Sequence, residues 1–439
     1  MRSRARRCAA LLLLLAAAAG VPVSAQHDHA AGPQAPEHQH GDTSLFVARE
    51  VSGTAWQPDA TPMHGLHGTW RGWELMLHGN VFLQWLYEPA ERHRSGGMAA
   101  QQVSSVNWGM VMAIRPLAGG RIGLRGMASL EPWTVTDCGF LNFLATGETC
   151  EGDSIHDRQH PHDLWMELAV DYERPLRGTL RWHVYGGMAG EPALGPAAFP
   201  HRPSAIANPV APITHHWLDA THISFGVVTA GVSDRRWRAE ASAFNGREPD
   251  AQRAGLDWGA LDSFSARLSL LPTDRLAIQV SGGHLSEAEF EFAPQPRTDV
   301  DRATASATYH RPLARGLWAT TLAYGVNRGT EALPEGIALL TTHAGLLESS
   351  LTVDGHTVFG RAELAGKPAH DLHAHEFGAA VFTFAKLQAG YQRSISGHGM
   401  TAGVGASVFV SLVPEAFEVH YAGRVAPGVG VYLNLRPGT

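Results

Sequence analysis

Polar and apolar side chains alternate along most of this chain, in segments of about ten residues. The stretch TLRWHV at 179–184 puts threonine, arginine and histidine on one side and leucine, tryptophan and valine on the other. The stretch DRATASAT at 301–308 has the same two-residue period. Because successive side chains of a β-strand point to opposite faces, this period predicts strands.

The alternating segments predict an all-β protein with about sixteen strands, between about 14 and about 18. We expect the stretch at 374–394 to be one long strand, although Ala385 and Lys386 could form a turn there. The expected strands lie at 73–86, 103–115, 119–132, 163–173, 179–189, 221–232, 236–245, 262–271, 274–285, 300–311, 316–327, 340–353, 355–365, 374–394, 400–412 and 427–436.

Short and long connections alternate between the expected strands. Tight turns such as RPLAGG at 115–120 and RPLARG at 311–316 contrast with long links such as 131–163 and 190–220. A soluble β-sandwich has no reason to alternate its connections in this way. A transmembrane up-and-down antiparallel β-barrel does, with short periplasmic turns and long extracellular loops. We expect its apolar face to contact lipid and its polar face to line a lumen.

The N-terminus indicates export. Residues 1–25 have the arginine-rich start, apolar core and small final residues of a signal peptide, and no later apolar run reaches the ~18–20 residues of a membrane-spanning helix. Residues 26–70 are expected to form a flexible, histidine-rich periplasmic arm, and residues 71–439 the barrel. The expected location is the outer membrane of a Gram-negative cell. In that oxidising environment, Cys138 and Cys150 are expected to form a disulfide.

Histidine is the unusual residue of this chain, with 25 copies against two lysines, Lys367 and Lys386. Three clusters precede expected strands in loops on the extracellular side, so they could converge at one end of the barrel. The candidate metal ligands in these clusters are His156, His160, His162, Asp163, His215, His216, Asp219, His222, His370, His373 and His375. Neutral imidazoles with a carboxylate suit Cu²⁺, Zn²⁺ or Ni²⁺, so the clusters predict a divalent transition-metal site.

The predicted arm has a histidine cluster of its own, with His27, His29, His38 and His40. Met63, in the stretch TPMHGLHGTW, adds a thioether that suits copper better than zinc. We therefore expect a barrel that binds divalent metal and passes it or confers tolerance to it. No other cofactor is expected to be required.

Two other functions remain open. A sixteen-stranded lumen lined by arginines suits a general diffusion porin for small solutes. An outer-membrane hydrolase could use His160 with Asp163, or His222 with Asp219, as a base and its orienting acid, but the chain has no Gly-x-Ser-x-Gly motif, and we expect no enzyme. The expected partners are outer-membrane lipid and metal ions or small solutes. The net charge of −7, without a basic run after the signal peptide, gives no reason to expect nucleic acid.

Several longer motifs resemble a group of Gram-negative outer-membrane barrel proteins. They are LHGNVFLQW at 77–85, DRQHPHD at 157–163, APITHHWLDATHISFGVVTAG at 211–231, SSLTVDGHTVFGRAEL at 349–364 and GVGVYLNLRPG at 428–438. The plan of leader plus barrel is also similar to that of the copper-resistance outer-membrane B proteins. Those proteins have methionine-rich leaders, whereas the leader of this chain is rich in histidine.

Overall fold

The structure is a computed structural model. It describes residues 44–88, 101–150, 153–289, 298–333, 336–418, 420–421 and 423–438. The expected signal peptide and residues 26–43 of the expected arm lie outside these ranges, with the four histidines of the arm. In the described part of the chain, no helix is long and apolar enough to cross a membrane.

Within these residues, sixteen antiparallel strands form a closed barrel, which confirms the predicted fold. Each strand pairs with the next along the chain, and the first also pairs with the last, which closes the barrel. The strands are β2 (Trp73–Tyr87), β3 (Gln101–Leu117), β4 (Gly120–Ala128), β9 (Trp165–Arg177), β10 (Leu180–Gly190), β11 (Ser224–Asp234), β12 (Trp237–Phe244), β13 (Ser263–Thr273), β14 (Leu276–Glu289), β15 (Thr298–Leu313), β16 (Gly316–Leu333), β17 (Gly336–Val353), β18 (His356–Pro368), β19 (Val381–Gly397), β20 (Met400–Leu412) and β21 (Val425–Pro437).

The largest differences from the predicted strand boundaries lie at two places. The expected strand at 374–394 begins only at Val381, because the residues before it form the short helices η4 (His370–Leu372) and η5 (His375–Phe377). His373 and Gly378 there have φ angles of 54° and 53°, which lie outside the range of regular extended backbone. The expected loop at 328–340 is mostly strand, because β16 and β17 stay paired as far as Leu333 and Gly336. Ala385 and Lys386 lie within β19, as predicted.

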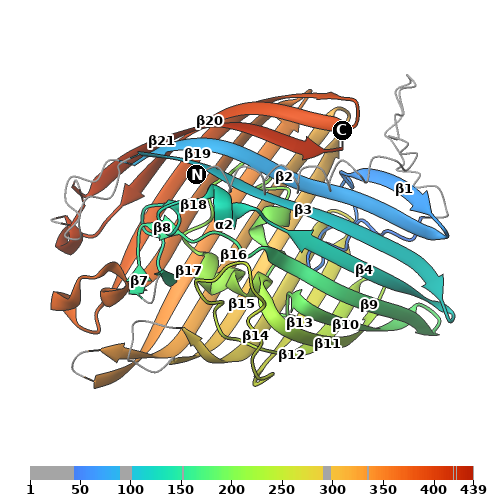
Figure 1. Cartoon of the computed structure of the whole chain (residues 1–439), viewed down its shortest axis with the longest axis horizontal. Helices are drawn as coiled ribbons and strands as arrows, with labels where there is room; N and C mark the ends of the chain where they lie inside the picture. The colour runs from blue at the N-terminus through green and yellow to red at the C-terminus, as the bar shows by residue number, and fades with distance from the viewer. Residues whose placement is uncertain are drawn as a thin grey trace, which may run out of the picture.

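The connections are short at one end of the barrel and long at the other (Figure 1). Residues 118–119 join β3 to β4, and residues 178–179 join β9 to β10. Residues 129–164 and 191–223, by contrast, connect β4 to β9 and β10 to β11. This asymmetry is the one expected for periplasmic turns and extracellular loops.

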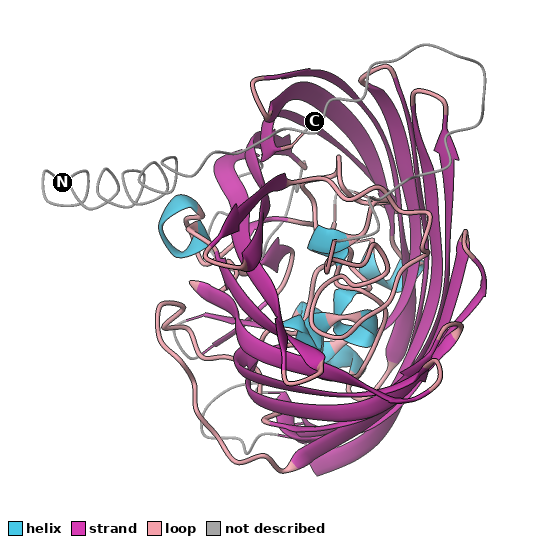
Figure 2. Cartoon of the chain, turned by 90° about the vertical axis from the view of Figure 1, so that its right-hand side faces the viewer, coloured by secondary structure: helices cyan, strands magenta, loops and turns pink. Residues whose placement is uncertain are grey.

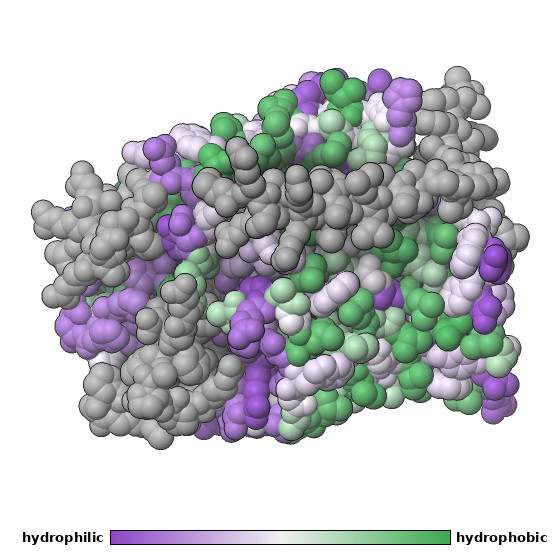
Figure 3. Space-filling view, in the orientation of Figure 1, coloured by the Kyte–Doolittle hydropathy of each residue, from purple (hydrophilic) through white to green (hydrophobic). Residues whose placement is uncertain are grey.

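The outer surface of the strands is apolar (Figure 3). Exposed aliphatic residues occur around the whole barrel, including Leu83, Val111, Val170, Val228, Val280, Leu322, Leu347, Val358, Leu387, Val408 and Leu433. In a closed barrel every strand has both neighbours, so lipid meets no unpaired backbone. The chain is therefore an outer-membrane β-barrel protein.

Three segments of the described chain fold into the barrel, where Figure 2 shows helices and loops inside the ring of strands. The N-terminal inner segment covers residues 44–64. The first inner loop, 129–163, contains α2 (Glu131–Thr134), β5 (Phe140–Leu141), β6 (Glu148–Cys150), β7 (Asp153–Ile155) and β8 (Arg158–Gln159). The second inner loop, 191–223, contains η2 (Phe199–His201), α3 (His215–Leu218) and η3 (Ala220–His222).

Charged residues of the wall hold these segments in place. Arg125 of β4 donates to the carbonyl oxygens of Val51 and Gly53, at 3.1 and 2.6 Å. Lys386 of β19 pairs with Glu88 at 2.7 Å and donates to Phe143 O at 3.2 Å. Arg125 and Lys386 are buried, so these hydrogen bonds replace the bonds that their charged groups would make to water. The inner segments therefore occupy part of the lumen as hydrogen-bonded parts of the fold (Figure 2).

The predicted arm of residues 26–70 needs correction at its C-terminal end. Residues 44–64 belong to the lumen, and β1 (Leu66–Trp70) pairs with β2. Segment 44–64 is held through its backbone, as when Leu45 N donates to Glu74 at 2.9 Å. The sequence of this segment does not predict such contacts, because they use backbone carbonyl and amide groups, which every residue type has.

The predicted disulfide between Cys138 and Cys150 is present in the first inner loop. Two tryptophans lie inside the barrel rather than on its outer surface. Trp108 and Trp217 are 8% and 4% exposed, and the indole of Trp217 donates to Thr342 Oγ1 at 2.8 Å. Trp70, at 52% exposure, lies on the outer surface.

Candidate functional site: an imidazole pocket inside the barrel

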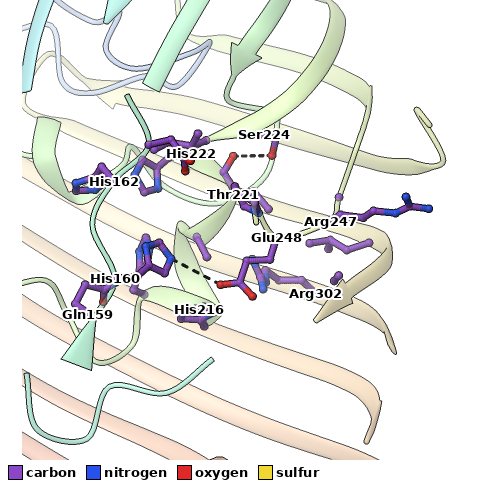
Figure 4. Close-up of a pocket in the computed structure, with 18 residues that line it drawn as sticks. Gln159, His160, His162, His216, Thr221, His222, Ser224, Arg247, Glu248 and Arg302 are labelled. Carbon is purple, nitrogen blue, oxygen red and sulfur yellow. Dashed lines mark hydrogen bonds and ion pairs between the residues drawn. The ribbon is translucent and has the colours of Figure 1, made fainter. Parts of the chain in front are cut away.

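The first and second inner loops together form a small pocket rich in imidazole (Figure 4). His160 and His162 come from the first loop, and His215, His216 and His222 from the second, so two of the three predicted clusters converge. The pocket has a volume of about 60 Å³, which is room for a few water molecules or one hydrated ion. Its polar lining also includes Asp163, Glu248 and Arg302.

His162 is oriented by a buried glutamate that the sequence did not single out. Its Nδ1 lies 3.0 Å from both carboxylate oxygens of Glu131, and its backbone N donates to Glu131 Oε2 at 2.9 Å. A carboxylate only accepts, so Nδ1 carries a proton, and in the neutral ring Nε2 has the lone pair. Burial acts against the charged form of this ring, but Glu131 raises the pKa of His162 above its usual value. Glu131 begins α2, and its carboxylate also accepts from Asn107 N of β3 at 3.0 Å. The wall of the barrel thereby fixes the ring.

His215 and His222 are oriented by one residue, Asp219. His215 Nδ1 donates to Asp219 Oδ1 at 2.8 Å, across one turn from α3. His222 Nδ1 donates to the backbone oxygen of Asp219, also at 2.8 Å. Asp219 itself is held by Arg202, whose Nη1 lies 2.6 Å from Oδ2. In both histidines Nε2 is again the lone-pair nitrogen, and in His222 this atom is buried without a hydrogen-bond partner.

His160 follows the same pattern, because its Nδ1 lies 3.0 Å from the carbonyl oxygen of Pro161. Its Nε2 faces Glu248, with 3.7 Å between Nε2 and Oε1 (Figure 4). In four rings of the pocket, Nδ1 thus donates a hydrogen bond to an oxygen atom. This is the usual arrangement around metal-binding histidines, in which an oxygen behind the ring fixes the tautomer and the orientation.

Burial keeps most of these rings neutral. The inner loops lie outside the membrane-spanning strands, and burial lowers the pKa of His215 to about 4 although the hydrogen bond to Asp219 acts in the opposite direction. Burial also holds the pKa of His160 and His222 well below the usual value. At neutral pH these imidazoles have lone pairs available for a ligand.

The spacing of the rings is compatible with one shared ion. The ring centre of His222 lies 5.3 Å from that of His162 and 5.2 Å from that of His215. Imidazoles bound through Nε2 to one tetrahedral Zn²⁺ have ring centres about 5 Å apart. As the side chains stand, however, no group of three or more His, Cys, Asp or Glu residues in the described ranges is arranged to hold a metal ion. Metal binding here requires the rings to turn so that the Nε2 atoms converge.

The remaining predicted ligands form a second group, and none of them lines the pocket. The ring of His156 lies 4.7 Å from that of His373, which is 6.0 Å from His375. His156 Nδ1 is 2.7 Å from Asp157 Oδ2, and His370 Nε2 is 3.1 Å from Asp371 Oδ1. The three predicted clusters therefore form two groups rather than one site.

The acid–base pairs considered for a hydrolase are arranged differently from the expectation. Asp163 Oδ2 pairs with Arg253 at 3.4 Å, and the carboxylate of Asp219 contacts His215 and Arg202. His222 reaches only the backbone oxygen of Asp219. Glu131, Arg202 and Arg253, which set this geometry, gave no signal in the sequence beyond their position in long connections.

No family model and no curated protein matches this chain. Solved structures of several outer-membrane proteins are similar to it in shape, among them the following three. A loop-deletion mutant of OmpT, an outer membrane protein of Vibrio cholerae, has 8% identity and a TM-score of 0.46 over 83% of this chain and 99% of that one. An anion-selective porin from Comamonas acidovorans has 11% identity and a TM-score of 0.46 over 84% and 100%. The outer membrane channel DcaP of Acinetobacter baumannii has 9% identity and a TM-score of 0.48 over 85% and 100%. At these values the likeness carries no argument about function.

Proposed function

We propose that this outer-membrane barrel binds a divalent transition-metal ion in the imidazole pocket, as a step in passing the ion or in tolerance to it. The observation that carries the proposal is the common orientation of His160, His162, His215 and His222. Each directs Nδ1 to an oxygen atom, so that Nε2 has the lone pair. His162, His215 and His222 would hold the ion once their rings turn so that the Nε2 atoms converge.

The buried Nε2 of His222 supports the same function. A buried ring nitrogen without a partner loses the hydrogen bond that it would make to water. A bound ion restores an interaction at this atom. Neutral imidazoles also suit Zn²⁺, Cu²⁺ and Ni²⁺ better than Mg²⁺ or Ca²⁺, which prefer oxygen ligands.

The test is calorimetric titration of the folded mature chain with Zn²⁺, Cu²⁺ and Ni²⁺. The four arm histidines, His27, His29, His38 and His40, are replaced by asparagine in every sample, so that they do not add sites. We expect about one ion per barrel, and a loss of that binding when His162, His215 and His222 are changed to alanine.

His356→Ala is the matched control, because His356 lies at the end of β18, where its Nδ1 contacts Tyr391 Oη at 2.7 Å. It should bind metal as the parent does. Equal binding by the triple variant and the parent would reject the pocket as a metal site.

A second candidate function is passage of small solutes, which the polar inner wall favours. Arg121, Arg238, Arg267 and Arg361 face the lumen in ion pairs with buried glutamates. Because the inner segments fill much of the lumen, we expect a conductance far below that of an open sixteen-stranded pore. Planar-bilayer recording of the purified protein measures this conductance. A large ohmic conductance would show that the inner segments do not obstruct the lumen.

A further inference from the structure

A second chamber, away from the imidazole pocket, lies between the N-terminal inner segment, the second inner loop and the wall formed by β2 and β3. Its volume is about 350 Å³. Its lining includes three thioethers and three imidazoles, from Met63, Met76, Met112, His64, His78 and His201. It shares no lining residue with the imidazole pocket.

The thioethers are brought together by strand register. Met76 of β2 and Met112 of β3 are direct cross-strand partners, and both side chains are buried. Such partners on one face have Cβ atoms about 5 Å apart, so that flexible side chains can share a ligand. Gly65, two residues after Met63, lies against Met76. A Cβ atom added at Gly65 would be 3.5 Å from Met76 Sδ.

The imidazoles and one indole border the same space. His78 follows Met76 on the inward face of β2, and its Nε2 is buried without a hydrogen-bond partner. The ring of Trp108 lies 5.3 Å from that of His78 and 4.6 Å from that of His201. An indole face attracts cations within about 6 Å, although it supplies no anionic charge.

Charge distinguishes this chamber from a site for divalent ions. The acidic residue in its lining, Glu50, is paired with Arg121 and lies 3.8 Å from Arg238. The lining also includes Arg436, so the chamber has no net negative charge to attract a divalent ion. Its soft donors are the neutral sulfur atoms of the methionines and the neutral imidazole nitrogen atoms. Soft, neutral ligands of this kind select a soft monovalent ion, because divalent ions gain more from carboxylates or from imidazole alone.

We propose that this chamber binds a soft monovalent cation, Cu⁺ or Ag⁺, through the sulfur atoms of Met63, Met76 and Met112 and the imidazole of His78. The inference is independent of the proposed function, because it concerns other residues and another class of ion. Six of the ten methionines of the chain lie in the apolar cluster around the chamber: Met63, Met76, Met110, Met112, Met127 and Met166.

The test is titration of the folded full-length mature chain with Ag⁺ in chloride-free buffer, and with Cu⁺ in competition with bicinchoninate under a reductant. The key variant is Met76→Leu with Met112→Leu. The control is Met127→Leu with Met166→Leu, which changes two methionines of the same cluster that do not line the chamber. Leucine conserves the volume, so both variants are expected to fold.

We expect the Met76/Met112 variant to bind Ag⁺ and Cu⁺ at least tenfold more weakly and the control to match the parent. X-ray absorption of the Cu⁺-loaded parent should show sulfur among the ligands, and the Met76/Met112 variant should lose part of that signal. Equal affinities of parent and key variant would overturn the proposal, as would equal weakening in the control or a coordination shell without sulfur.

Zn²⁺ binding separates this proposal from the previous one. The Met76/Met112 variant should bind Zn²⁺ as the parent does, whereas the variant lacking His162, His215 and His222 should keep its Cu⁺ affinity. If either variant lost the binding of both Zn²⁺ and Cu⁺, the two sites would not be independent and this inference would fail.

Discussion

Arg202 and Asp219 form a buried ion pair inside the barrel, with 2.6 Å between Nη1 and Oδ2. Arg202 Nε also donates to Glu348 Oε1 of β17 at 2.6 Å. The first bond lies within the second inner loop, and the second links that loop to the wall. Because Asp219 also orients His215 and His222, the same arginine connects the stability of the loop with the geometry of the imidazole pocket.

Replacing this arginine should therefore affect both properties. Arg202→Met leaves the carboxylates of Asp219 and Glu348 buried without their shared partner, which we expect to cost about 3–5 kcal/mol of unfolding free energy. Urea unfolding of the refolded protein in detergent measures the loss. Arg236→Met is the control, because the pair of Arg236 with Asp274 is more than half exposed on both sides, so its loss should change stability little. Similar values for the two variants would contradict this account of Arg202.

Glu131 should act on metal affinity through His162. Glu131→Gln keeps the size of the side chain but removes the carboxylate that accepts from His162 Nδ1. Loss of such an oxygen partner typically lowers metal affinity about 10–100-fold. Zn²⁺ titration of parent and variant provides the comparison. An unchanged affinity in a folded Glu131→Gln protein would show that His162 needs no such support, or that it is not a ligand.

Gly53 should control how firmly the N-terminal inner segment closes the lumen. Its φ is 51°, and a Cβ at this position would lie 2.6 Å from Glu191 Cβ. Gly53→Val therefore cannot be accommodated where the segment now lies, and we expect a severalfold rise in single-channel conductance. Gly72→Val is the control, because Gly72 also has a positive φ of 81° but no neighbour within 4 Å. Unchanged conductance in Gly53→Val would mean that the segment does not limit passage.

Glu191 should make stability depend on pH. This residue lies in the second inner loop, and burial raises its pKa to about 8, although Arg267 acts against the shift. A raised carboxyl pKa means that the folded chain keeps a proton that the unfolded chain releases near its usual value of 4.5. The free energy of unfolding should then fall as the pH rises from about 4.5 to about 8. Glu191→Gln should reduce this slope, as measured by urea unfolding across that range, and an identical slope in both proteins would remove Glu191 as its cause.

The sequence alone determined the barrel, its strand number and the side of each strand that faces lipid. It did so because lipid imposes a two-residue period on every crossing, so that segments such as 179–184 and 301–308 carry the whole fold signal locally. The disulfide of Cys138 and Cys150 was also predictable, because the two cysteines are only 12 residues apart in the sequence. Outside the lipid this constraint ends, which is why the paired ends of β16 and β17 and the helices before β19 were missed.

Only the tertiary structure decided what lies inside the barrel. The convergence of His162 with His215 and His222 depends on how two long loops fold, and their separation from His373 and His375 depends on the same packing. The inward position of Trp108 and the pairing of Met76 with Met112 follow from strand register and closure of the barrel. The buried position of Trp217 follows from the folding of the second inner loop. Alternation assigns a residue to a face, but distances across a lumen arise from contacts between segments far apart in the chain.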